Sequence, residues 1–133
     1  MSTNVSVPKP ARWKAIGFWT LKIVFALAFF GAAAFKFSGA APAVAEFDQI
    51  GLGQWFRYFT GACEFIGAGL LLVPVTSGFG AILLTCVSIG AFLTQLLALH
   101  GDVIHTFIFI GAMGWIAWVT RDQVLGRLGL ASL

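Results

Sequence analysis

The sequence predicts an all-α membrane protein, a membrane-embedded up-down-up-down bundle of four helices. The chain of 133 residues is 59% hydrophobic and only 10% charged, whereas a soluble domain has about 25% charged residues. Its apolar residues form four runs, 16–35, 55–75, 79–99 and 103–119. Each run is close to the ~20 residues that cross a hydrocarbon core of ~30 Å as a helix. The runs lack the period-2 alternation of barrel strands, so helices are expected.

Basic residues lie at the two ends of the chain and predict its orientation. Lys9, Arg12 and Lys14 precede the first apolar run, and Arg121 and Arg127 follow the fourth. Lysine and arginine concentrate on the cytoplasmic side of membrane proteins. Both termini are therefore expected in the cytoplasm, as an even number of spans requires.

This orientation divides the chain into a polar cytoplasmic segment 1–14, a transmembrane domain 15–120 and a cytoplasmic tail 121–133. A basic start, an apolar run and small residues also characterise a signal peptide. The first run is long for such a peptide and contains Lys22, so we expect this helix to be retained. The membrane accounts for the basic ends, and no nucleic-acid partner is expected.

Segment 40–54 is the longest connection between apolar runs. Proline at a first helical position and glycine after the last are start and stop signals, and Pro42 and Gly51 stand in these places. We expect a short interfacial or re-entrant helix on the outer side, with an ordered loop as the alternative. The other links, 74–78 and 100–102, are tight turns, which make neighbouring helices antiparallel.

Glu64 is the most informative residue because it lies near the middle of the second apolar run. An ionisable group at bilayer depth costs roughly 2.5–3.5 kcal/mol and indicates a functional site or a charged partner. Arg57 lies seven residues earlier on the same helix face, with Gly61 between them, so this face is expected inside the bundle. The rise of ~10 Å between the two is too long for a direct pair.

Lys36, at the end of the first helix, is the expected partner of Glu64, because a buried carboxylate needs a cation to stay ionised. Its long stem can bend toward the core or toward the interface, and we expect the first. Lys22 lies on the same face but nearer the cytoplasm, and we expect it to extend to that interface. The sequence leaves open whether Glu64 meets a lysine or a ligand.

The third run places Thr85, Ser88 and Gln95 on one side of its helix. We expect Thr85 and Ser88 to make structural polar contacts, which contribute ~0.6 kcal/mol each in membranes. Gln95 completes the candidate ligand-binding or proton-exchanging set, whose other members are Lys36, Arg57 and Glu64. No catalytic residue is assigned.

The histidines and cysteines form no metal or redox motif. His100 and His105 flank Asp102 at a turn, where solvated side chains are expected. Cys63 and Cys86 lie on different helices without a Cys-x-x-Cys pair and are expected to be small apolar residues. We expect no metal and no intrinsic cofactor.

Three segments resemble the DoxX-like family of small four-helix bacterial membrane proteins, and the resemblance covers roughly 16–120. They are FGAAAFKF at 30–37 and WFRYFTGACE at 55–64, followed by GAGLLLVP at 67–74. The resemblance implies a multi-pass protein of the bacterial inner (plasma) membrane. Family members include subunits named for quinol oxidase and thiosulfate:quinone oxidoreductase systems, and a distant animal relative assists the assembly of acetylcholine receptors. Related sequences often carry a histidine late in the third helix, where this chain has Gln95.

Two functions are expected from the residues and the resemblance. The first is an accessory subunit of a quinone-linked oxidoreductase system, which binds a small amphipathic ligand, a quinone, beside the Lys/Arg/Glu cluster. The alternative is a non-enzymatic binding or assembly protein whose charges are structural. Its small residues, such as Ala28, Ala32, Gly111 and Gly114, would then contact a protein partner or a second copy in a homodimer. A transporter is less favoured because four helices are few.

Overall fold

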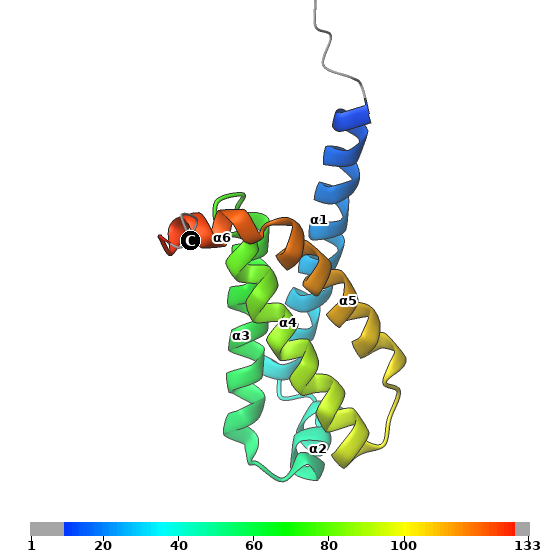
Figure 1. The fold of residues 1–133 in the computed structure, drawn as a ribbon. Coiled ribbons are helices and arrows are strands. Elements are labelled where there is room, and N and C mark those ends of the chain that lie inside the picture. Colours follow the sequence, from blue (N-terminus) through cyan, green and yellow to red (C-terminus); the bar gives the residue numbers. More distant parts are fainter. Residues whose placement is uncertain (1–9, 130–133) are drawn as a thin grey trace, which may run out of the picture.

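The computed structural model describes residues 10–129, which form helices joined by short turns (Figure 1). In chain order these are α1 Pro10–Phe37, α2 Ala41–Ile50, α3 Gln54–Leu72, α4 Ser77–Thr94, the π-helical turn η1 Gln95–Leu99, α5 Ile104–Val119 and α6 Arg121–Arg127. No strand occurs among the described residues. The predicted all-α class is confirmed.

The four long helices α1, α3, α4 and α5 lie side by side (Figure 1). α1 packs on α3, α3 on α4, and α4 on α5. Edge-on aromatic pairs, Phe18 with Trp115 and Phe25 with Phe109, join α5 to α1. Figure 1 shows α2 at one end of the molecule and α6 at the other. We refer to the α2 half and the α6 half of the molecule.

The close-packed core extends from the middle of the molecule into the α6 half. Its buried members are Ala26, Phe29, Ala68, Leu71, Ala81, Leu84, Met113 and Ile116. Gly80 brings the backbones of α3 and α4 into contact, because a Cβ there would lie 2.5 Å from the amide nitrogen of Leu71 and 2.7 Å from the carbonyl oxygen of Gly67. Small residues are the usual means of such close approach in membrane helices.

The last described helix, α6, is docked on the turn between α3 and α4. It is bent by 58° from α5 and buries Val124. Gln123 donates to the carbonyl oxygen of Pro74 and accepts a hydrogen bond from the amide of Gly78 at 3.3 Å. The predicted tail 121–133 therefore begins as a packed helix.

The structure bears on two of the expected segments. α1 begins at Pro10, before the expected start of the transmembrane domain at residue 15, because proline suits a first helical turn. Within segment 40–54, α2 resolves the choice between helix and loop in favour of the helix. The parts of the predicted terminal segments at 1–9 and 130–133 lie outside the described residues.

By length and composition, two helices are able to cross a membrane, at Arg12–Phe37 and Ser77–Leu99. The bent pair α5 and α6 adds a third if it counts as one broken span. α3 is not among them, because Gln54, Arg57 and Glu64 lower its hydropathy. The two charged side chains of α3 do not face outward, since Arg57 is 4% exposed and Glu64 6% exposed.

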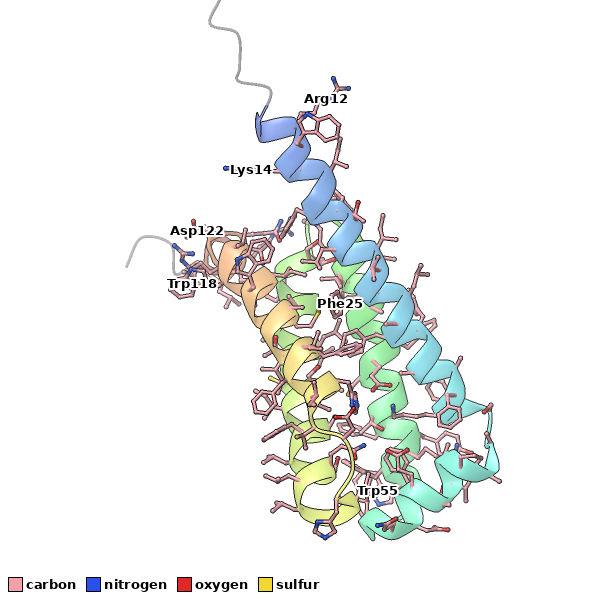
Figure 2. The ribbon with its side chains drawn as sticks, turned by 90° about the vertical axis from the view of Figure 1, so that its right-hand side faces the viewer. Arg12, Lys14, Phe25, Trp55, Trp118 and Asp122 are labelled. Atoms are coloured by element: carbon pink, nitrogen blue, oxygen red, sulfur yellow. The ribbon has the colours of Figure 1, made fainter. Side chains whose placement is uncertain are left out.

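The outer surface is apolar, as lipid contact requires. Large hydrophobic side chains such as Val24, Leu27, Phe65 and Ile108 are more than half exposed, whereas soluble monomers rarely expose broad apolar patches. In Figure 2 the charged residues Arg12, Lys14 and Asp122 lie toward the α6 end, and Trp55 lies at the opposite end.

Candidate functional site

The site is built around an ion pair between α1 and α3. Lys36 Nζ donates to Oε1 and Oε2 of Glu64, at 2.9 Å each. The Glu64 side chain is 8% exposed and that of Lys36 17% exposed. Lys36 stands in the last turn of α1, where the helix dipole favours a cation. The expected contact between these two residues is present.

Arg57 supports this pair without joining it. Its Nε donates to Gln54 Oε1 at 2.8 Å, and its guanidinium donates to the backbone oxygen of Lys36. The guanidinium carbon also lies 4.3 Å from the ring centroid of Tyr58. Arg57 therefore ties the end of α1 to α3, and, as expected, it does not reach Glu64. Gly61 lies against the end of α1, where a Cβ would lie 3.3 Å from Phe37 Cζ and 3.4 Å from Lys36 Cβ.

A cavity of about 320 Å³, here called the large cavity, adjoins the pair between α2, α3 and α4. Most of its walls are apolar, and Phe56, Phe59, Leu83 and Val87 are among the residues that form them. The polar groups at the cavity are Lys36, Glu46, Thr60, Glu64, Thr94 and Gln95. Apolar walls with a few polar groups are typical of small-molecule sites.

A small cavity of about 170 Å³ lies on the other side of the pair, between α1, α4 and α5. It shares Lys36, Glu46 and Glu64 with the large cavity. Two further residues on it, His105 and Thr106, come from the start of α5. The Lys36–Glu64 pair thus lines both the large and the small cavity.

Gln95 lines both cavities and lies where the backbone changes from α- to π-helical. π-helical turns are frequent at functional sites. The turn ends at His100, which has a φ of 50°, and the amide of Gly101 donates to the backbone oxygen of Gln95 at 3.2 Å. Gln95 therefore shares both cavities with Lys36 and Glu64, whereas Arg57 supports the site from outside them.

Thr85 and Ser88 hydrogen-bond within α4 rather than across to another helix. Their hydroxyls donate to the backbone oxygens of Ala81 at 2.6 Å and Leu84 at 2.7 Å. A hydroxyl in a helix has the carbonyl four residues earlier within reach, so this local bond takes the place of the expected contact between helices. Ser88 also lines the small cavity.

Sequence reasoning missed Glu46, which lines both cavities from α2. Three residues later, Gln49 Nε2 donates to the backbone oxygen of Ala98 in η1 at 3.1 Å. Residues three apart share a helix face, so this bond turns Glu46 toward the cavities. The signal in the sequence was an acidic residue on a short helix beside the apolar Ala43 and Phe47, which are both buried.

The two cysteines also lie at the large cavity. Cys63 and Cys86 are free thiols on α3 and α4, and both contribute to its wall. They were expected only as small apolar residues within their helices. Both α3 and α4 therefore contribute a thiol to the lining of the large cavity.

Lys22 does not extend to the interface, and this expectation was wrong. The residue is 4% exposed, its Nζ donates to Ser77 Oγ at 3.2 Å, and it lies 3.8 Å from the ring centroid of Trp19. Ser77 in turn donates to the backbone oxygen of Leu71 at 2.8 Å. The C-terminal carbonyl groups of α3 carry partial negative charge, which stabilises the buried ammonium.

The histidines lie at the edge of the molecule. His105 Nδ1 is 3.8 Å from Asp102 Oδ2, and both side chains are more than half exposed. His100 is exposed as well. Over the described residues, no group of three His, Cys, Asp or Glu side chains is arranged to hold a metal ion.

An apolar exterior, long hydrophobic helices and buried charges define this chain as a helical membrane protein in contact with lipid. The DoxX-like family model matches residues 20–120, which is most of the described helical part. The chain belongs to the DoxX-like family, and the resemblance seen in the sequence is confirmed. Neither the curated proteins nor the solved structures give a match.

Proposed function

We propose that this protein binds a small amphipathic, quinone-like ligand in the large cavity, as an accessory subunit of a quinone-linked oxidoreductase system. The observation that carries the proposal is the combination of an apolar cavity of about 320 Å³ with the buried Lys36–Glu64 pair in contact with it. The volume lies within the roughly 300–1,000 Å³ of ligand sites. An apolar ligand body fits the walls, and its polar head meets the ion pair.

The proposed setting is the bacterial inner membrane, crossed four times by α1, α3, α4 and α5 in an up-down-up-down bundle with both termini in the cytoplasm. α3 takes part as a span because Arg57 and Glu64 are buried inside the bundle. The basic residues Arg12, Lys14, Arg121 and Arg127 belong to α1 and α6, toward the α6 end, which the positive-inside rule assigns to the cytoplasm. α2 then lies on the outer side, over the large cavity.

A cysteine-accessibility experiment tests this orientation. Cys63 and Cys86 are replaced by serine, and one new cysteine is introduced at Asp102 or at Asp122, both of which are exposed. In cells with a permeabilised outer membrane, an impermeant thiol reagent is expected to label Asp102→Cys and to spare Asp122→Cys. Labelling of Asp122→Cys alone would reverse the orientation.

A titration tests ligand binding. The full chain is placed in lipid nanodiscs and titrated with a short-chain ubiquinone analogue, which is followed by quenching of tryptophan fluorescence. We expect saturable binding, and we expect Glu64→Gln to weaken it at least tenfold. The ammonium of Lys36, which can donate to a quinone carbonyl, loses its charged anchor in this variant, and a hydrogen bond from a charged group contributes about 1.5–3 kcal/mol. Unchanged binding by a folded Glu64→Gln protein would refute the proposal.

A second variant fills the cavity without altering a charge. Gly90 lines the large cavity, and a Cβ there meets no other atom within 4 Å. Gly90→Leu is therefore expected to fold and to lose binding. Gly111→Leu is the matched control, because Gly111 is equally unobstructed but belongs to neither cavity. Equal ligand binding by Gly90→Leu and Gly111→Leu would show that the ligand does not occupy the large cavity.

One observation favours the alternative, a non-enzymatic binding or assembly protein. The direct contact of Lys36 with both oxygens of Glu64 is the arrangement expected of a structural pair that fixes α1 against α3. The exchanged pair Lys36→Glu with Glu64→Lys separates the two functions. Recovery of both stability and cellular function would favour the structural role, whereas recovery of stability alone would favour the ligand site.

A further inference from the structure

Hydrogen-bond donors and acceptors are unequally distributed around the Lys36–Glu64 pair. Lys36 offers three N–H donors, and each ionised carboxylate offers about four acceptor positions. Two donors of Lys36 are directed at Glu64. Arg57, the nearby second cation, donates instead to Gln54 and to the backbone of Lys36. The donors that remain for both cavities are the third N–H of Lys36 and the side-chain amide of Gln95.

Glu46 adds a second carboxylate to the same spaces. It lines both cavities and is only partly exposed. Within residues 12–129, no side chain or amide donates a hydrogen bond to its carboxylate, and the ion pairs there are Lys36–Glu64 and His105–Asp102. Two carboxylates and one ammonium group therefore border the cavities, with a surplus of acceptors and an excess of negative charge.

We propose that the cavity selects ligands whose head group donates hydrogen bonds, so that a hydroxyl-bearing quinol binds more tightly than the corresponding quinone or an anionic amphiphile. Glu46 is the residue that sets this preference. A quinol hydroxyl donates to the free carboxylate of Glu46, while the apolar body lies along the aromatic and aliphatic walls. A quinone presents only carbonyl acceptors, and a fatty-acid anion is repelled. This inference rests on the proposed function and specifies the ligand class of the same cavity.

The test compares three probes on the unaltered full chain in nanodiscs. They are a short-chain ubiquinol kept reduced under anaerobic conditions, the matching ubiquinone, and dodecanoate, each titrated by calorimetry. We expect the quinol to bind about tenfold more tightly than the quinone, the effect of one hydrogen bond to a charged group. Dodecanoate is expected to bind more weakly than either.

Two variants on α2 test whether Glu46 causes the preference for quinol over quinone. Glu46→Gln removes the unpaired charge, and we expect the quinol advantage over the quinone to fall to threefold or less. Asp48→Asn is the matched control, because it removes a charge from the same helix at a residue that belongs to neither cavity and accepts instead from Gln54 at 2.7 Å. This control is expected to keep the full preference.

The outcomes distinguish this inference from the proposed function. Equal binding of quinol and quinone, or tighter binding of the quinone, overturns the inference and leaves the ligand site standing. Failure of all three probes to bind overturns both. A quinol preference that survives in folded Glu46→Gln overturns the role of Glu46. The comparison on the unaltered chain is decisive even if a variant does not fold.

Discussion

α1 buries two lysines on one face, and the two halves of the molecule surround them differently. In the α6 half, Lys22 contacts a serine hydroxyl and an aromatic ring inside close packing. In the α2 half, Lys36 contacts a carboxylate that borders two cavities. Both side chains are largely shielded from solvent by protein, and of the two lysines only Lys36 lines the large and the small cavity.

The difference has its origin in how closely the helices approach one another. Around Gly80 the backbones of α3 and α4 touch, close to Ser77, the hydrogen-bond partner of Lys22. Toward the α2 half, α4 ends in a π-helical turn and α2 covers the opening. A buried charge therefore marks a candidate binding site in this bundle only where the helices diverge beside it.

The largest expected effect is on stability, when each of the two lysines is replaced in turn. Lys36→Met leaves the Glu64 carboxylate buried without its partner, which costs about 3–5 kcal/mol of unfolding free energy. Lys22→Met leaves only a serine hydroxyl that still donates to Leu71, so we expect a loss of about 1 kcal/mol. Both are measured by denaturant unfolding in micelles. The double variant Lys36→Met with Glu64→Met should regain most of the stability, and equal losses in the two single variants would remove the distinction between the lysines.

The next effect concerns helix approach. Gly80→Ala forces a Cβ against the backbone of α3, and overpacking of this kind costs about 1–3 kcal/mol; we expect about 2. Gly90→Ala on the same helix meets no atom within 4 Å and should be neutral or stabilising by up to about 1 kcal/mol, the helix preference of alanine over glycine. Thermal unfolding of the two proteins measures the contrast. A tolerated Gly80→Ala would contradict the direct contact of α3 with α4.

The smallest effect concerns the short helices at the two ends. Gln49→Ala removes the hydrogen bond from α2 to η1, worth about 1 kcal/mol, and should raise hydrogen exchange of α2 amides about fivefold. Gln123→Ala removes the contacts of α6 to the α3–α4 turn and should have the same effect on α6. Only Gln49→Ala should also alter quinol binding. Unchanged exchange in α2 would show that other contacts hold this helix over the cavity.

Much of this arrangement could be predicted from the sequence, because membrane helices follow from hydropathy and buried charges from their rarity. The all-α fold, the helix at 40–54 and the Lys36–Glu64 contact were accessible in this way. Lys22 was wrongly expected at the interface. The groups that stabilise its buried ammonium lie at the end of α3 and at Ser77, and a sequence pattern does not show that these come close to Lys22. Glu46 was missed because its position depends on how α2 packs over η1. The expected contacts of Thr85 and Ser88 with other helices do not form, because both hydroxyls donate to backbone oxygens of α4 itself.

α5 has a consequence for the surrounding bilayer. Its 16 residues span about 24 Å at 1.5 Å per residue, whereas the 28 residues of α1 span about 42 Å. In the proposed four-span arrangement, α5 is shorter than a hydrocarbon core of ~30 Å, and α6 turns aside directly after it. Lipids beside α5 must thin to match it, at a cost of fractions of a kcal/mol per Å. The protein therefore favours thinner regions of membrane, or a neighbour that covers its short side.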